Sequence, residues 1–139
     1  MTDKNITKLF TDGGARGNPG PAAAGVHIIW PTGEVYDFGK YLGEQTNNQA
    51  EYQALYLGLK YLRDQGVPKV IVYMDSELII RQLKREYKVK NQDLAKWFVK
   101  VWNIAQEFSS ISWQHVPRAD NKAADKQVNI ALDKAQANS

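Results

Sequence analysis

The chain has 139 residues, of which 43% are hydrophobic and 24% are charged, and its formal net charge is +3. This length and apolar content suit one globular domain with its own core, so we expect a single domain over residues 1–139. Cysteine is absent from the sequence, which excludes a disulfide framework, a thiolate metal site and a thiol nucleophile. No apolar run approaches the roughly 18 residues of a membrane span, and no basic-then-apolar leader opens the chain. We therefore expect a cytoplasmic protein with no membrane partner.

The first third of the chain predicts a meander of three strands, which cover residues 6–12, 23–30 and 34–42. The short connections, with a Pro-Thr-Gly turn at 31–33, favour antiparallel pairing. The first run ends in Asp12, and Gly13 and Gly14 follow it. These glycines allow a sharp turn and a close approach by a ligand. Asp12 is thus predicted where a strand leaves the core, a costly position for a charge unless a cation binds it.

The rest of the chain alternates between helical and strand patterns. Predicted helices cover about 46–65, 91–108 and 121–135, and a further short helix is predicted after Ser76, which can cap it. Predicted strands cover 70–74 and 111–116. Thr46 and Gln49 have the spacing of a capping box. The run at 70–74 is apolar throughout, which favours a parallel strand buried on both faces. His115 continues the apolar side of the last strand, so we interpret it as a packed histidine.

Four acids stand at the ends of these core elements. Glu51 lies one turn into the first helix on its inward face, and Asp75 follows the central parallel strand, where open α/β sheets bind ligands. Asp125 lies beside the apolar stripe of the last helix. Three of these acids also have an ordinary explanation. Glu51 and Asp125 could simply complement a helix dipole, and Asp75 could cap a helix. Near the start of the last helix, Asp120 competes with Asp125 as a simple capping residue.

Taken together, the acids predict a metal site. Asp12, Glu51, Asp75 and Asp125 would repel one another unless divalent cations lay between them. Oxygen-only ligands suit Mg²⁺ or Mn²⁺ rather than zinc. Two such ions about 4 Å apart are the apparatus for attack by water on a phosphodiester.

Four segments together resemble the type 1 ribonuclease H family, and they appear in the family's order. They are FTDGGARGNPGPAAAG, TNNQAEYQAL, YMDSELIIRQL and ADNKAADKQVN. The resemblance covers nearly the whole chain. It implies an α/β fold with a mixed five-stranded sheet in the order 3-2-1-4-5, strands 1–3 antiparallel, flanked by helices. The implied activity is hydrolysis of the RNA strand of RNA–DNA hybrids by two metal ions, leaving 5′-phosphate and 3′-hydroxyl ends.

The resemblance also implies roles for individual residues. Asp12 would bridge two Mg²⁺ ions, for which Mn²⁺ could substitute; Glu51 and Asp75 would hold the ion beside the leaving 3′ oxygen, and Asp125 the ion that activates water. Glu51 would also contact the RNA 2′-hydroxyl, the group that separates RNA from DNA. Residues expected in the substrate groove are Gly13, Gly14, Asn18, Thr46, Asn47, Asn48 and Ser76. We expect a monomer whose partner is the hybrid, with double-stranded RNA as a further candidate.

The sequence departs from the family pattern in three places. The segment HVPRADNKAAD is short and lacks the histidine that many members carry before the last acid. Arg118 is the nearest residue that could replace this histidine. A role as a surface arginine or as a phosphate contact is an equally good interpretation of Arg118. Many members also have an extra helix with a basic protrusion that binds the DNA strand, but the segment between Ile80 and Asn91 is too short to contain it. Glu77 stands where the family often has Gln. These features indicate a compact form of the family. Some basic residues could replace part of the missing contact with the DNA strand, or could form only a solvated charged surface. They are Lys84, Arg85, Lys88 and Lys90.

Three other functions stay open on the sequence. A nucleic-acid-binding module that kept the fold without catalysis would be favoured by the loss of one acid, and all four are present. A sugar-kinase or chaperone-type ATPase also opens with an aspartate-glycine phosphate loop, but it needs two such domains. A 3′-exonuclease on the same scaffold would carry a different acid pattern near the first strand.

Overall fold

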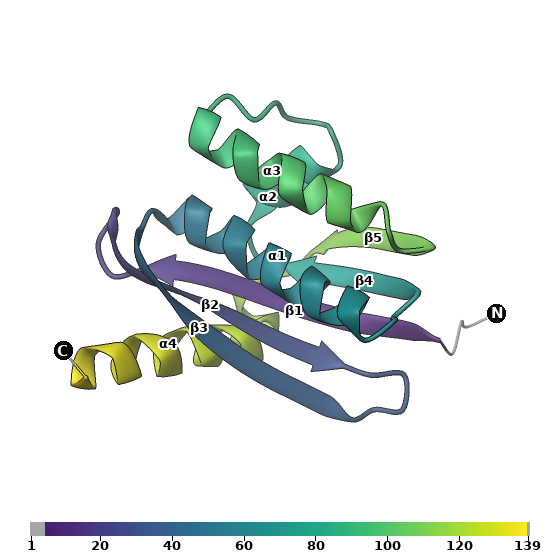
Figure 1. Ribbon diagram of the computed structural model, residues 1–139, viewed down its shortest axis with the longest axis horizontal. Helices are drawn as coiled ribbons and strands as arrows, with labels where there is room; N and C mark the ends of the chain where they lie inside the picture. Colours follow the sequence, from purple (N-terminus) through teal and green to yellow (C-terminus); the bar gives the residue numbers. More distant parts are fainter. Residues whose placement is uncertain (1–4, 139) are drawn as a thin grey trace.

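A five-stranded sheet forms the centre of the protein, and helices lie on both of its faces (Figure 1). The computed structural model describes residues 5–138. The strands are β1 (Ile6–Ala15), β2 (Gly20–Ile29), β3 (Val35–Gln45), β4 (Lys69–Met74) and β5 (Ser110–His115). The helices are α1 (Asn47–Asp64), α2 (Glu77–Leu83), α3 (Gln92–Ala105), the 3₁₀ turn η1 (Arg118–Asp120) and α4 (Lys122–Ala137).

The sheet topology confirms the prediction. The strand order is β3-β2-β1-β4-β5. β2 pairs antiparallel with both β1 and β3, whereas β4 pairs parallel with β1 and β5. Residues 84–91 join α2 to α3 with no helix between them, as the compact form predicts. Within residues 5–138, every helix is too short or too polar to span a bilayer.

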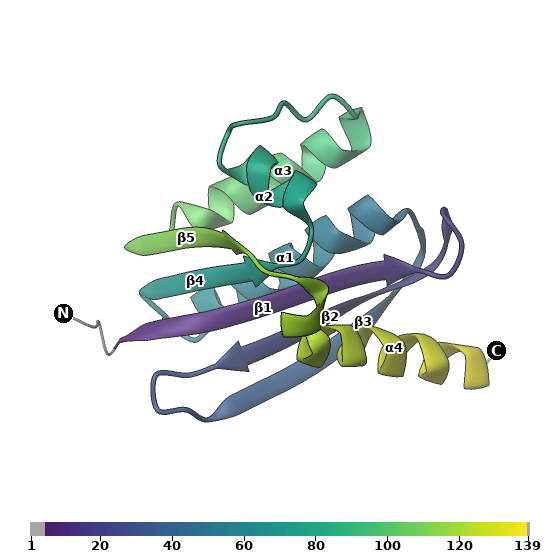
Figure 2. The same cartoon turned by 180° about the vertical axis from the view of Figure 1, so that it is seen from behind.

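The helices divide into two layers. α1 and α3 lie on one face of the sheet, and α4 lies on the other (Figures 1 and 2). The larger core forms under α1, where Leu9 and Val72 of the sheet and Leu55 and Leu59 of the helix are fully buried. Burying each such side chain contributes about 2 kcal/mol. A smaller core joins β2 to α4 and consists of Ala23, Val128, Leu132 and the half-buried Ala131.

The start of α1 follows from the predicted capping box. The Thr46 hydroxyl accepts a hydrogen bond from the backbone N–H of Gln49 at 3.2 Å, and the Gln49 side chain accepts one from the backbone N–H of Thr46 at 2.8 Å. Two N–H groups that have no partner within the helix are thereby satisfied. The helix therefore begins at a fixed residue, which fixes the position of Glu51 one turn later.

β1 is longer than predicted, which corrects the position of Asp12. Pairing with β2 continues through Asp12 to Ala15, opposite Ala22. Asp12 thus lies within a strand rather than at its end, because small residues on both strands let the ladder continue past it. On its other side, β1 pairs with β4 only as far as Phe10 opposite Tyr73. Beyond that pair, the edge of β1 is open toward the residue that follows β4, which is Asp75.

Two burial predictions were wrong. β4 is fully buried on one face only: Val72 is buried, whereas Ile71 and Tyr73 are half-buried because α4 packs over β1, β2 and β3 and does not cover β4. His115 is exposed rather than packed, because β5 is an edge strand and the residue stands at its end.

Candidate active site

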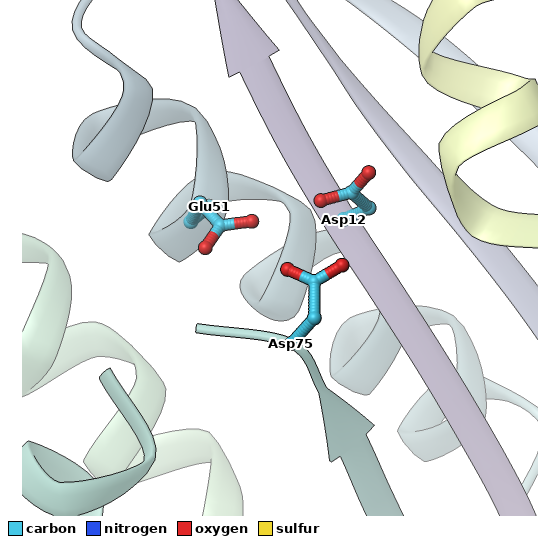
Figure 3. A group of neighbouring side chains, drawn as sticks. All are labelled: Asp12, Glu51 and Asp75. Atoms are coloured by element: carbon cyan, nitrogen blue, oxygen red, sulfur yellow. The ribbon is translucent and has the colours of Figure 1, made fainter. Parts of the chain in front are cut away.

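Three carboxylates from three different elements converge (Figure 3). Asp12 comes from β1, Glu51 from α1 and Asp75 from the residue after β4. One oxygen of each lies within 4.8 Å of the corresponding oxygens of the other two. Asp12 and Glu51 are only 9% and 8% exposed. The sheet and α1 thus bring together acids that lie far apart along the chain.

Gly13 allows α1 to approach β1 this closely. A Cβ atom at Gly13 would lie 2.3 Å from the carbonyl carbon of Ala50 and 2.4 Å from the backbone nitrogen of Glu51. Such contacts are with backbone atoms, which cannot turn aside. The backbone N–H of Gly13 also donates to Oε1 of Glu51 at 3.1 Å. A glycine therefore sets both the distance between the two elements and the direction of the Glu51 carboxylate.

The three acids open into a cavity of about 270 Å³ that also reaches Asp125 and Arg118. Asp125 comes from the first turn of α4, and Arg118 from η1. Both residues are exposed. The structure therefore brings all four predicted acids to one cavity, three in close contact and the fourth at its rim. The other lining residues are Gly13, Gly14, Asn47, Asn48 and Val128.

The electrostatics show how unfavourable this cluster is without a counter-charge. Burial raises the pKa of Asp12 to about 9, and the charges of Glu51 and Asp75 and a contact with Asp125 add to the effect. Burial also raises the pKa of Glu51, although hydrogen bonds from its neighbours oppose the shift. Burial therefore makes the charged forms of Asp12 and Glu51 less favourable than they are in water, a cost that a bound cation would offset.

The residues present fit a hard divalent cation. The donors are carboxylate oxygens, which Mg²⁺ and Mn²⁺ prefer, and the site offers no imidazole or thiolate. Several negative groups share a small volume, and binding positive charge there would relieve their repulsion. A phosphate could not enter such a cavity alone, because Arg118 is the sole cationic residue among those that line it.

The predicted groove residues have mixed positions. Asn47 and Asn48 line the cavity, whereas Asn18, Thr46 and Ser76 do not. Asn18 accepts a hydrogen bond from the backbone N–H of Asn47 at 3.1 Å, and the Asn47 side chain accepts one from Ala15 at 2.8 Å. These two asparagines thus tie the β1–β2 loop to the start of α1. The Ser76 hydroxyl accepts a hydrogen bond from the backbone N–H of Ile79 at 3.3 Å and so caps α2, and it also lies close enough to Glu51 to lower its pKa.

Sequence reasoning missed Asn121 as a site residue, since it was used only to mark the start of the last helix. The side chain is 1% exposed, and its Nδ2 donates to the carbonyl oxygen of Thr11 at 2.9 Å and to Oδ2 of Asp75 at 3.2 Å. The only sequence signal is an asparagine four residues before Asp125, a spacing that occurs in many helix starts. Nothing in the sequence shows that its amide points away from the helix.

Comparisons with known proteins identify the family of the chain and agree with its fold. A family model described as reverse transcriptase-like matches residues 10–131. A ribonuclease H of Cyanothece sp. is 30% identical over 138 residues, which cover 88% of this chain and 83% of the relative. The chain belongs to the ribonuclease H family.

Other members of the ribonuclease H family extend the comparison. The solved structure of LC11-RNase H1 in complex with an RNA/DNA hybrid matches with a TM-score of 0.88 and 44% identity, over 94% of this chain and 99% of that one. A bifunctional protein of Mycobacterium tuberculosis is 39% identical over 130 residues, which cover 91% of this chain. The chain spans only 35% of the length of that relative. The ribonuclease H fold thus occurs both alone and within longer proteins.

Proposed function

We propose that this protein hydrolyses the RNA strand of RNA–DNA hybrids and leaves 5′-phosphate and 3′-hydroxyl ends. The observation that carries the proposal is the convergence of Asp12, Glu51 and Asp75 within 4.8 Å in a cavity that Asp125 also lines. Relatives named ribonuclease H and a neighbour solved with an RNA/DNA hybrid support the substrate class. We further propose that the chain acts as a single domain, as a monomer and in the cytoplasm.

The acids would hold two Mg²⁺ ions, or two Mn²⁺ ions. Asp12, Glu51 and Asp75 would hold one, and Asp12 and Asp125 the other. When bound, the ions supply Lewis-acid stabilisation of charge at the phosphate and lower the pKa of a bound water. The protein's own contribution is to keep the carboxylates oriented: Gly13 directs Glu51, and Asn121 contacts Asp75. Preformed orientation of this kind avoids reorganisation during the reaction.

Other residues at the cavity would bind the substrate without reading its sequence. Gly13 and Gly14 have no side chains, so a nucleotide backbone could approach β1 closely. The amides of Asn47 and Asn48 can form hydrogen bonds with sugar and phosphate oxygens. Glu51 would contact the 2′-hydroxyl, which would restrict cleavage to RNA. Arg118 would stand in for the missing loop histidine and help the product to leave.

A cleavage assay on four labelled substrates tests the proposal. RNA–DNA hybrid, double-stranded RNA, single-stranded RNA and single-stranded DNA would each be incubated with the protein in Mg²⁺, Mn²⁺ or EDTA. We expect cleavage within the RNA strand of the hybrid in either metal and none in EDTA, with 3′-hydroxyl ends that a polymerase can extend. The double-stranded RNA arm shows whether the specificity is looser. Cleavage in EDTA, or no cleavage of the hybrid in either metal, would contradict the proposal.

A further inference from the structure

Asn121 occupies the junction of three elements that carry the site. Its side-chain amide contacts the backbone of β1 through Thr11, next to Asp12, and the side chain of Asp75 after β4. Its backbone carbonyl accepts a hydrogen bond from the N–H of Asp125 at 3.1 Å in the first turn of α4, and its own N–H donates to Arg118 at 3.0 Å. Asn121 therefore contacts three residues that line the cavity, Asp75, Arg118 and Asp125, and the neighbour of a fourth, Asp12.

Asn121 lies at the N-cap of α4, but its side chain does not cap the helix. Asparagine is among the preferred N-cap residues, because its side-chain oxygen accepts a hydrogen bond from the first turn. Thr46, Ser76 and Asn91 each form such a bond at the starts of α1, α2 and α3. Asn121 stands at the N-cap of α4 and forms none. Its Oδ1 is buried and has no hydrogen-bond partner within residues 5–138.

The two acceptors explain why the amide is turned this way. The carbonyl of Thr11 and the carboxylate of Asp75 both require a donor, and the amide NH₂ of Asn121 offers two hydrogens. The reversed orientation would place Oδ1 against two other oxygens. An uncapped helix and an unpaired buried oxygen both cost stability. Local rules of this kind are broken mainly at functional sites.

We infer that Asn121 is a positioning residue for cation binding. It would orient Asp75 directly, and it would set where α4 begins relative to β1 and so where Asp125 lies. The inference rests on the proposed function, since it concerns the same metal site. Groups that hold a metal ligand in place typically change metal affinity or activity by roughly 10–100-fold when they are removed.

Two substitutions separate this role from a purely structural one. Asn121→Ala removes the bridge and offers no cap. Asn121→Ser also removes the bridge, because its hydroxyl is too short to reach both acceptors, but serine is a preferred N-cap. Thr11→Val is the matched control: it changes a buried neighbour whose hydroxyl has no partner, and it keeps the carbonyl that Asn121 contacts.

Mn²⁺ binding would be measured by isothermal titration calorimetry on each variant without substrate, and thermal unfolding would be measured in EDTA. We expect Mn²⁺ affinity to fall by roughly 10–100-fold in both Asn121 variants and to stay unchanged in Thr11→Val. Serine should regain thermal stability relative to alanine but not Mn²⁺ affinity. If the Asn121→Ala variant does not fold, the Mn²⁺ affinity of Asn121→Ser relative to the unmodified chain still shows whether Asn121 positions the cation ligands.

Three results overturn the inference. One is unchanged Mn²⁺ affinity in either Asn121 variant, and another is recovery of affinity by serine together with stability. These two leave the proposed function intact if the unmodified chain binds Mn²⁺ and cleaves the hybrid. The third is an unmodified chain that neither binds Mn²⁺ nor cleaves the hybrid, which overturns the proposed function as well.

Discussion

The inner acids, Asp12, Glu51 and Asp75, differ in their setting from the outer pair, Asp125 and Arg118. Asp12 and Glu51 are almost completely buried, and all three inner acids come from β1, α1 or the end of β4. The outer pair is exposed and comes from η1 and the first turn of α4. Both groups line one cavity. The two helices that contribute to it, α1 and α4, lie on opposite faces of the sheet (Figures 1 and 2).

This difference shows how the site is built. The positions of the inner acids follow from the sheet order and from the close approach of α1 to β1 at Gly13. The outer pair depends on where α4 begins, which a single buried asparagine fixes. Substitutions among the inner acids should therefore act on cation binding as a whole. Loss of Asp125 should weaken the second ion that it would hold with Asp12, whereas changes at Arg118 should affect turnover only.

The largest expected effect is loss of an inner acid. Asp12→Asn or Asp75→Asn should abolish Mg²⁺-dependent cleavage of a labelled hybrid, because the amide cannot supply a negative ligand. Thermal unfolding in EDTA should show equal or higher stability, since like-charge repulsion is relieved. Asp120→Asn, an exposed acid outside the cavity, is the control and should cleave normally. Near-normal cleavage by either inner variant would refute the assignment.

Gly13→Ala should have the next largest effect. The added Cβ would lie 2.3–2.4 Å from the backbone of α1, and overpacking of this kind costs about 3 kcal/mol of unfolding free energy. Gly14→Ala is the matched control, because its Cβ would make an ordinary 3.7 Å contact with Val128. Denaturant unfolding of both variants measures the difference. Equal stability of the two would show that the inner acids do not depend on close approach of α1 to β1.

The pH dependence of the unfolding free energy should show that burial raises the pKa of Asp12. Its pKa in the folded chain is about 9, against 3.8 for the ordinary group. Between these values the folded state binds more protons than the unfolded state, so stability falls as pH rises through this window. For this one group, the slope should be at most about 1.4 kcal/mol per pH unit in EDTA. Urea unfolding from pH 5 to 9 measures it, and Asp12→Asn should flatten the curve. A rise in stability across this range would contradict the raised pKa.

The smallest effect should come from Arg118→Ala. We expect turnover to fall about threefold to fivefold, which is less than about 1 kcal/mol in the barrier, with hybrid affinity nearly unchanged. Lys122→Ala removes a nearby exposed base that does not line the cavity and serves as the control. Steady-state kinetics separate kcat from KM. A larger loss of affinity than of turnover would make Arg118 a phosphate contact only.

Much of this arrangement could be predicted from the sequence, because the signals were local. The capping box at Thr46 and the apolar run before Asp75 predicted single elements, and the four acids were singled out by their positions at the ends of such elements. The strand order came from the resemblance of the four motifs to the ribonuclease H family. The errors came from contacts between distant segments. The continuation of β1 to Ala15 depends on β2, and the exposure of His115 depends on the edge position of β5. The orientation of Asn121 depends on Thr11, 110 residues away, and on Asp75.

The most direct test of the account is anomalous diffraction from a crystal of the protein grown with Mn²⁺. We predict two anomalous peaks in the cavity, one contacted by Asp12, Glu51 and Asp75 and the other by Asp12 and Asp125. An empty cavity in saturating Mn²⁺, or ions bound without Asp12, would contradict the claim that these acids form a two-metal centre.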